Sequence, residues 1–223
     1  MKQGKFIVID GPDGSGKSTQ VKLLADYLKR RGHRVCVVRE PGSTVISEQV
    51  RRILLDTRNK RMTPETELFL YMASRAQLAA EVISPALRQG RIVIADRFLS
   101  STIAYQGYGG GINRDSIRQM GAIATGGLKP DILIILDIKS DAGLNRIRKG
   151  FALCSQSGMA RGRHRSSFDR MEKKKLAFHQ KVRLGFRALG RLGANSALID
   201  ADRPASQVHK EVIDIVAGKL RLR

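Results

Sequence analysis

Tryptophan is absent from this sequence, and cysteine is nearly so, with two residues in 223. Two cysteines cannot form the disulfide framework that small secreted domains need, so we interpret Cys36 and Cys154 as reduced thiols. No apolar run approaches the roughly 20 residues that cross a bilayer. The first residues also lack the charged region, apolar core and small-residue cleavage site of a secretory signal. We therefore expect a cytoplasmic protein with no membrane partner.

Acidic residues are scarce relative to basic ones. The chain has 41 Lys+Arg against 20 Asp+Glu, which gives a formal net charge of +21. The excess is uneven, since residues 139–191 hold 15 basic and 3 acidic side chains, a difference of +12. A basic balance favours anionic partners, but aromatic residues for base stacking make up only 5% of the chain. We expect no nucleic-acid partner, and a solvated basic surface is an equal explanation of the charge.

Five short apolar runs and the helical segments between them organise the chain. The runs are typical of strands buried on both faces of a parallel sheet, and they cover residues 5–10, 34–38, 91–95, 132–136 and 196–200. Segments with helical period cover residues 17–32, 47–56, 64–90, 116–124, 141–149, 168–190 and 205–220. This alternation predicts one α/β domain over residues 1–223, a five-stranded parallel sheet flanked by helices.

The stretch "GPDGSGKS" follows the first predicted strand and precedes the first predicted helix. It spells G-x-x-x-x-G-K-[ST], a loop whose backbone N–H groups cradle phosphates together with the helix N-terminus beyond it. Lys17 would reach the β- and γ-phosphates, and Ser18 would place its hydroxyl on Mg²⁺. Motors, GTPases, transporters and kinases share this loop, so it does not choose a reaction. The predicted nucleotide-binding residues are Gly11, Pro12, Asp13, Gly14, Ser15, Gly16, Lys17, Ser18 and Thr19.

Two polar segments follow the second and third predicted strands. "REPGST" (39–44) and "ADRFLSSTIAYQG" (95–107) lie at the carboxyl edge of the sheet, where open α/β folds bind ligands. Together with "LFLYMASRAQ" (68–77), they resemble the thymidylate kinase family. That family typically shows G-x-D/E-G-x-G-K-[ST], R-E-P-G-G-T, F-x-x-x-R-A-Q and D-R-Y/H followed by S-x-x-A-Y-Q-G, in that order. The match covers nearly the whole chain.

This resemblance implies a fold and a reaction. The family has a P-loop fold of the nucleoside-monophosphate-kinase type with a mobile lid. It transfers the γ-phosphoryl group of ATP to dTMP with Mg²⁺, giving dTDP and ADP in the synthesis of dTTP, and it usually forms homodimers. On this ground we expect an ATP-dependent dTMP kinase that uses ATP and Mg²⁺ and forms a homodimer.

The resemblance also implies roles for individual residues on the acceptor side. Arg97 would clamp the dTMP phosphate, and Arg39 would approach that phosphate or order the loop around it. Asp96 would lie near Mg²⁺ or its waters, as would Asp13 of the phosphate loop. Thymine and deoxyribose would be held by Tyr71 (stacking), Arg75 (the carbonyl edge), Tyr105 (against a 2′-hydroxyl), Ser101, Thr102 and Gln106. The alternative for Asp96 and Arg97 is a structural ion pair.

Residues 150–167 are small, polar and basic and fit neither period, so we expect a mobile lid there. Arg161, Arg163 and Arg165 alternate within it. The resemblance to the bacterial subtype implies that one of them acts on the transferring phosphoryl group with Lys17 and Arg97. Which one acts is open, and so is the alternative that all three belong to the basic surface.

The sequence departs from the family motifs at two positions. Ser43 replaces the second Gly of R-E-P-G-G-T, which would cost about 1 kcal/mol or more if the position needs positive φ. Phe98 replaces the usual Tyr or His. Three other interpretations stay open: another nucleotide or deoxynucleoside kinase, a nucleic-acid-dependent ATPase, and a nucleotide-binding regulator without turnover.

Overall fold

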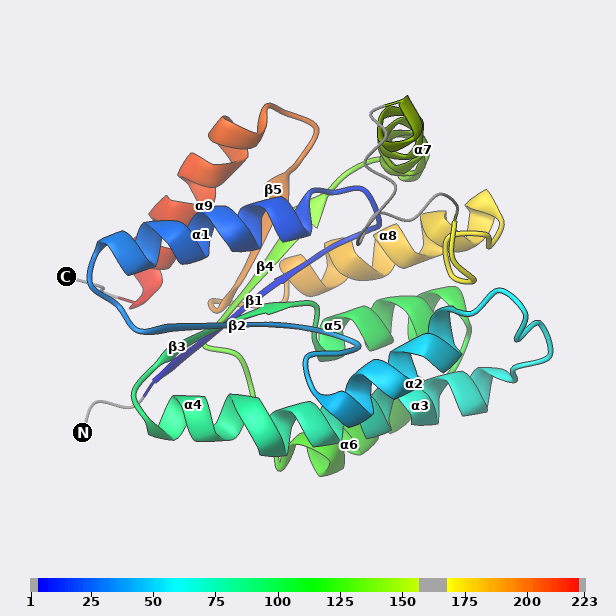
Figure 1. The fold of residues 1–223 in the computed structure, drawn as a ribbon, viewed down its shortest axis with the longest axis horizontal. Coiled ribbons are helices and arrows are strands. Elements are labelled where there is room, and N and C mark those ends of the chain that lie inside the picture. Colours follow the sequence, from blue (N-terminus) through cyan, green and yellow to red (C-terminus); the bar gives the residue numbers. More distant parts are fainter. Residues whose placement is uncertain (1–3, 157–167, 221–223) are drawn as a thin grey trace.

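The computed structural model describes residues 4–156 and 168–220. Its sheet has five parallel strands in the order β2-β3-β1-β4-β5 (Figure 1). The strands are β1 (Lys5–Asp10), β2 (Val35–Arg39), β3 (Ile92–Asp96), β4 (Ile132–Asp137) and β5 (Ser196–Asp200). The predicted five-stranded parallel sheet is therefore confirmed, with β1 at its centre between β3 and β4.

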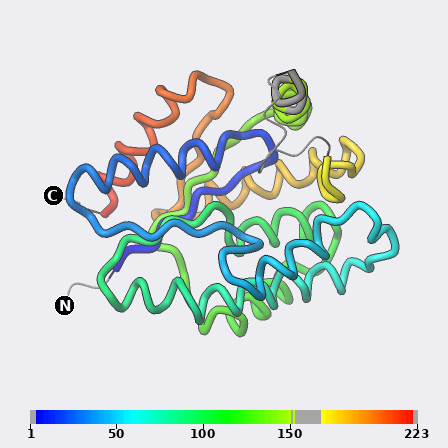
Figure 2. Tube along the Cα trace, viewed as in Figure 1, coloured from blue at the N-terminus to red at the C-terminus, as the bar shows by residue number. Residues whose placement is uncertain are grey.

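Helices connect the strands and cover the sheet, as the chain trace in Figure 2 shows. The α-helices are α1 (Lys17–Arg30), α2 (Val45–Leu55), α3 (Pro64–Leu78), α4 (Ser84–Arg88), α5 (Leu99–Thr102), α6 (Arg114–Thr125), α7 (Ser140–Gln156), α8 (Leu176–Gly190) and α9 (Ala205–Leu220). Two stretches widen into π-helix, η1 (Ala79–Ile83) and η2 (Ile103–Gly109). Within the described residues, no helix combines the length and apolar character needed to cross a bilayer.

The two faces of the sheet bury alternate residues of the same strand. In β1, Ile7 and Ile9 pack against α1 and α9, and Phe6 and Val8 pack against the opposite layer, which contains η1 and α4 (Figure 1). All four side chains are at most 1% exposed. Because successive side chains of a strand point to opposite faces, a run that is apolar throughout requires a cover on both sides.

The ends of the helices follow their local sequence. The Thr63 hydroxyl accepts a hydrogen bond from the Thr66 N–H, and Pro64 occupies the first helical position of α3. The Thr44 hydroxyl caps α2 in the same way by accepting from the Ser47 N–H. These caps fix where the helices on the acceptor side of the sheet begin.

Pro85 falls late in the helical segment predicted over residues 64–90, where a proline usually kinks or ends a helix. The helical course instead continues to Arg88, and the π-helical η1 lies directly before Pro85. Proline lacks an N–H, and its ring clashes with the carbonyl four residues earlier, so a wider turn at this point accommodates it. The helix changes its geometry there rather than stopping.

Two predictions about the segment around the lid were wrong. Residues 150–156 were expected to be irregular, but α7 continues to Gln156. The next helix was expected to begin at Phe168, but α8 begins at Leu176, because the Asp169 carboxylate accepts from the N–H groups of residues 171 and 172 and closes a local turn. The remaining predicted lid residues, 157–167, lie outside the described residues, and so do Arg161, Arg163 and Arg165.

Candidate active site

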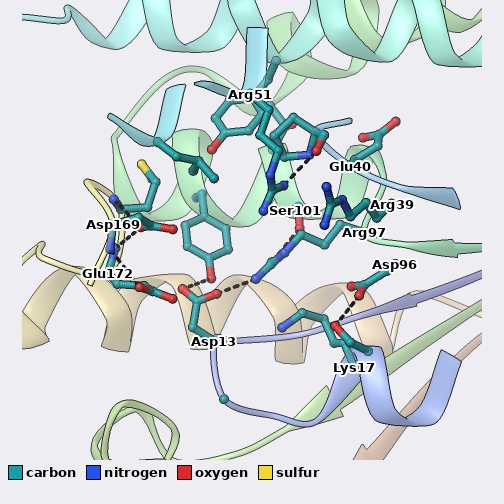
Figure 3. Close-up of a pocket in the computed structure, with 18 of the residues that line it drawn as sticks. Asp13, Lys17, Arg39, Glu40, Arg51, Asp96, Arg97, Ser101, Asp169 and Glu172 are labelled. Atoms are coloured by element: carbon teal, nitrogen blue, oxygen red, sulfur yellow. Dashed lines mark hydrogen bonds and ion pairs between the residues drawn. The ribbon is translucent and has the colours of Figure 1, made fainter. Parts of the chain in front are cut away.

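A pocket of about 480 Å³ opens at the carboxyl edge of the sheet, between the phosphate loop and the α2, α3 and η2 helices (Figure 3). Its size is typical of small-molecule sites. Most predicted site residues within the described ranges line it: Asp13, Gly14, Gly16, Lys17, Ser18, Thr19, Arg39, Tyr71, Arg75, Asp96, Arg97, Ser101, Thr102, Tyr105 and Gln106. Gly11, Pro12 and Ser15 belong to the same loop but do not line the pocket.

The phosphate loop takes a backbone course that requires glycine. Gly11, Gly14 and Gly16 have φ of 146°, 76° and 89°, in the region that L-residues with a Cβ rarely adopt. A Cβ on Gly14 would lie 2.1 Å from the carbonyl oxygen of Gly143. The loop is therefore held in a concave form before any ligand binds, as an anion cradle at the start of α1 requires.

Lys17 is folded back onto this loop. Its Nζ donates to the carbonyl oxygens of Gly11 at 3.0 Å and Pro12 at 2.8 Å, and the residue is 7% exposed. Burial, reinforced by the positive charge of Arg97, lowers the pKa of Lys17 to about 8. The carboxylates of Asp13, Asp96 and Asp10 favour the charged ammonium but do not outweigh these two effects.

Ser18 and Asp96 form an oxygen pair beside the loop. The Ser18 hydroxyl, at the start of α1, donates to Asp96 Oδ2 at 2.6 Å, at the end of β3. Oxygen donors of this kind suit Mg²⁺, which keeps several waters and is usually held by one or two protein groups plus substrate phosphates. The described residues contain no group of three or more His, Cys, Asp or Glu that could hold a metal ion by itself. The residues present fit a phosphate-borne magnesium ion.

Arg97 is held by a network of short contacts. It has φ of 76°, and its guanidinium donates to Ser101 Oγ at 3.0 Å, pairs with Asp13 and lies 3.6 Å from Asp10. The Tyr105 hydroxyl donates to the other oxygen of Asp13 at 2.6 Å. Burial opposes the ionisation of Asp13, but the charges of Arg97 and Lys17 outweigh it and lower the pKa of Asp13. A strained backbone kept in place by surrounding contacts is common at functional sites.

Asp10 connects the phosphate loop to the segment after β3. It is fully buried and accepts from the Gly11 N–H and from the hydroxyls of Ser100 and Ser101. The carboxylate therefore fixes two loops relative to each other. Arg97, which starts the second of these loops, is positioned against the first one.

At the other end of the pocket, Arg75 is buried and paired. Its Nε and Nη2 donate to Glu40 Oε2 at 2.9 and 2.7 Å, and Nη2 also donates to Thr102 Oγ1 at 3.0 Å. Arg75 is 1% and Glu40 5% exposed. Glu40 therefore supports Arg75.

The loop after β2 places two more arginines near Arg97. Arg39 pairs with Glu48 at 3.0 Å, and Arg51 on α2 donates to the Pro41 carbonyl at 2.8 Å. Burial, followed by the charges of Arg39 and Arg97, lowers the pKa of Arg51. Three guanidinium groups therefore line the same pocket, and Arg97 is the one of them that pairs with Asp13 of the phosphate loop (Figure 3).

Sequence reasoning missed Arg51 and Arg146, both of which line the pocket. Arg51 lies one helical turn before Leu55, which also lines it, so both belong to one face of α2. Arg52, the next residue, is exposed. The sequence alone does not tell these two arginines apart, because which of them faces the pocket depends on where α2 begins, at Val45. Arg146 on α7 donates to the Ala201 carbonyl at 3.0 Å, a contact between distant segments that local sequence patterns do not predict.

Comparisons with known proteins agree with this geometry. A family model described as thymidylate kinase matches residues 9–212. The thymidylate kinase of Nitratidesulfovibrio vulgaris (strain DP4) is 44% identical over 216 residues, with 96% of this chain and 93% of the relative covered. That of Exiguobacterium sp. (strain ATCC BAA-1283 / AT1b) is 40% identical over 219 residues, covering 98% and 96%.

A solved structure of a thymidylate kinase also matches this chain. The crystal structure of thymidylate kinase from Ehrlichia chaffeensis matches with a TM-score of 0.72 and 32% identity, covering 96% of this chain and 98% of that one. The family model, the relatives and the fold thus agree over nearly the whole chain. The chain belongs to the thymidylate kinase family.

Proposed function

We propose that this enzyme transfers the γ-phosphoryl group of ATP to dTMP, and that the pocket between the phosphate loop and the three arginines is where transfer occurs. The observation that supports this most strongly is that one pocket is lined by the glycine loop with Lys17 and also by Arg39, Arg51 and Arg97. Arg97 connects the two groups, because it pairs with Asp13 of the loop. In-line phosphoryl transfer needs donor and acceptor held face to face, with positive charge around both.

On the acceptor side, Arg97 binds the dTMP phosphate. It is fixed by Asp13, Asp10 and Ser101, so a bound phosphate meets a guanidinium that is already oriented. Arg51 contributes a second positive charge from α2. Arg39 holds the loop, because its side chain pairs with Glu48, which also accepts from the Ser43 N–H at 2.9 Å.

The thymine ring occupies the end of the pocket lined by Tyr71, Arg75 and Gln106. Arg75 donates to the carbonyl edge of the base, with Glu40 and Thr102 holding it in that direction. Tyr71 provides an aromatic face for stacking. Tyr105, buried against Phe186 and hydrogen-bonded to Asp13, occupies the space in which a ribose 2′-hydroxyl would need room.

Ser18 and Asp96 hold Mg²⁺ on the donor side, directly or through its waters. A bound magnesium ion neutralises charge on the β- and γ-phosphates. Lys17 leaves its loop carbonyls for the same phosphates. We propose that one of Arg161, Arg163 and Arg165, which lie outside the described residues, completes the charge around the transferring group.

Product analysis tests the reaction. Purified protein incubated with MgATP and dTMP should form dTDP and ADP in equal amounts, as resolved by chromatography. ADP formed without dTDP, and stimulated by DNA, would instead favour a nucleic-acid-dependent ATPase. ATP binding without any product would favour a regulator without turnover.

Lys17 should take up a proton when MgATP binds at alkaline pH. Its pKa of about 8 in the free enzyme lies below the usual 10.5, so the side chain is largely neutral at pH 9. Bound phosphates favour the charged form and raise that pKa, whereas at pH 7 the lysine is already charged. The number of protons taken up per bound MgATP can be measured by calorimetry, from the binding enthalpy in buffers that differ in their heat of ionisation. We expect clear proton uptake at pH 9 and almost none at pH 7.

Lys17→Arg is the control for this experiment, since arginine stays charged throughout this range. The variant should bind MgATP with no difference in proton uptake between the two pH values. Equal uptake by the variant and the parent enzyme at pH 9 would assign the proton to another group.

We also propose that the enzyme forms a homodimer through α2, α3 and α6. Large exposed apolar side chains lie on these helices, which pack beside one another: Val45, Ile46, Ile53, Phe69 and Ile123. Exposed apolar surface of this kind is typical of protein contact sites. Sedimentation should give a dimer for the parent chain and a monomer for Phe69→Glu, and an unchanged dimer in that variant would place the contact elsewhere.

A further inference from the structure

Glu67 is a buried carboxylate beside the pocket that the proposed reaction does not use. It lies on α3 and is 4% exposed. Its Oε2 is 2.6 Å from Arg170 Nη2 and 3.8 Å from Lys174 Nζ, and its Oε1 accepts from Gln106 Nε2 at 2.7 Å. The Glu67 carboxylate is thus buried between two cationic side chains and a donor amide.

Arg170 is itself fixed, so the arrangement is rigid. Its Nε donates to the Leu54 carbonyl at 2.8 Å, and its backbone N–H donates to the Leu55 carbonyl at 3.4 Å. The Arg170 guanidinium therefore holds the carboxylate of Glu67 in one position at the end of α2. Glu67 in turn contacts Gln106, which is 3% exposed and lines the pocket.

The Glu67 carboxylate, paired with Arg170, decides which way the amide of Gln106 faces. Carboxylate oxygens only accept hydrogen bonds, so the NH₂ of the amide must point at Glu67 and the carbonyl oxygen must point away. Among the described residues, none donates a hydrogen bond to that carbonyl oxygen. Gln106 consequently offers the pocket an acceptor and not a donor.

We propose that Glu67 is a positioning residue that sets pyrimidine specificity through Gln106. This rests on the proposed function, because it concerns the base of the acceptor nucleotide. Thymine and uracil carry an N3–H donor beside the O4 carbonyl that Arg75 serves, whereas cytosine carries an N3 acceptor and a 4-amino group. An acceptor fixed beside the donor Arg75 matches thymine and uracil and opposes cytosine.

The substitution Glu67→Gln tests this. It keeps the size of the side chain but allows either amide group to face Gln106, so Gln106 can turn. We expect kcat/KM for dTMP and dUMP to fall about tenfold through KM, with kcat nearly unchanged. The kcat/KM for dCMP should stay level or rise. The ratio of kcat/KM for dTMP to that for dCMP should therefore fall about tenfold or more. Arg75 still opposes the 4-amino group, so dCMP stays the poorer substrate.

Two controls accompany the variant. Glu65→Gln makes the same charge change at an exposed position of the same helix. It should leave kcat/KM for dTMP, dUMP and dCMP unchanged. In a Gln106→Leu background, Glu67→Gln should have no further effect on the dTMP/dCMP ratio, because the group through which it acts is gone. If Glu67→Gln does not fold, the charge-neutral pair Glu67→Gln/Arg170→Gln tests the same ratio.

The outcomes separate this inference from the proposed function. Turnover of dTMP by the parent enzyme tests the proposed function alone. If the parent enzyme phosphorylates dTMP but Glu67→Gln lowers kcat/KM equally for dTMP, dUMP and dCMP, Glu67 is only a structural support and the inference is wrong. A full Glu67→Gln effect in the Gln106→Leu background would overturn it equally.

Discussion

Replacing Arg97 with Ala should lower kcat/KM for dTMP by at least about 10³-fold, the range that a phosphate-stabilising arginine contributes. Arg97 pairs with Asp13 of the phosphate loop, and no other lysine or arginine in the described ranges makes its contacts to Asp13 and Asp10. The backbone contributes little to the effect, since alanine at φ of 76° is strained much as arginine is. Steady-state kinetics with MgATP and dTMP measure it.

The matched control is Arg118→Ala, which removes an arginine from an exposed ion pair on α6. It should leave kcat/KM within about twofold, because exposed ion pairs contribute little. The kinetics should be read together with a thermal unfolding curve for each variant. A folded Arg97→Ala enzyme with near-normal turnover would mean that the acceptor phosphate binds elsewhere.

Replacing Arg75 with Met should cost about 3–5 kcal/mol of unfolding free energy, because it leaves the Glu40 carboxylate buried without a partner. Glu40 Oε2 loses two hydrogen bonds, and its Oε1 already has none. Burial raises the pKa of Glu40, and Arg75 opposes that effect. Urea unfolding followed by circular dichroism gives the free energy directly.

The double variant Arg75→Met/Glu40→Gln distinguishes the pair from simple packing. It removes both charges, so it should be clearly more stable than Arg75→Met alone, although dTMP binding stays weak. If the double variant is as unstable as the sum of its two single variants, the Arg75–Glu40 pair does not couple, and the account of Arg75 as a braced base-reading group fails.

The sheet and the phosphate loop were predictable because their signals are local. Each strand is a continuous apolar run, and the Gly spacing of the loop reflects the positive φ of Gly11, Gly14 and Gly16. The motif also indicated that Ser43 could occupy a position that needs positive φ, and this is confirmed, since its φ is 71°. The strain of a non-glycine residue there is offset by a contact, because Ser43 Oγ accepts from the Arg39 N–H at 2.9 Å.

Phe98 shows the limit of motif comparison. It replaces the usual Tyr or His of the family motif, and it is 2% exposed and packs edge-on against Phe6, with ring centroids 5.0 Å apart. The Arg75 guanidinium lies 5.5 Å from its ring centroid. Phe98 therefore supports Arg75, a role that depends on tertiary packing and not on the position in the motif.

The remaining site residues could not be predicted because they act across long sequence separations. Glu40, directly after β2, meets Arg75 of α3, and Glu67 meets Arg170 from segments more than 100 residues apart. The start of α8 was misplaced because the side chain of Asp169 competes with the helix for the backbone. Helical period describes which residues share a face, but it does not describe which distant chain covers that face.

The central claim is that one pocket joins an ATP phosphate site to a site for thymidine monophosphate. The most direct test is to measure kcat/KM for phosphorylation by MgATP across dTMP, dUMP, UMP, dCMP, dAMP, dGMP and thymidine. The account predicts the highest value for dTMP, a lower one for UMP because of Tyr105, and none for thymidine, which lacks the phosphate that Arg97 binds. Equal turnover of purine and pyrimidine monophosphates, or turnover of thymidine, would contradict it.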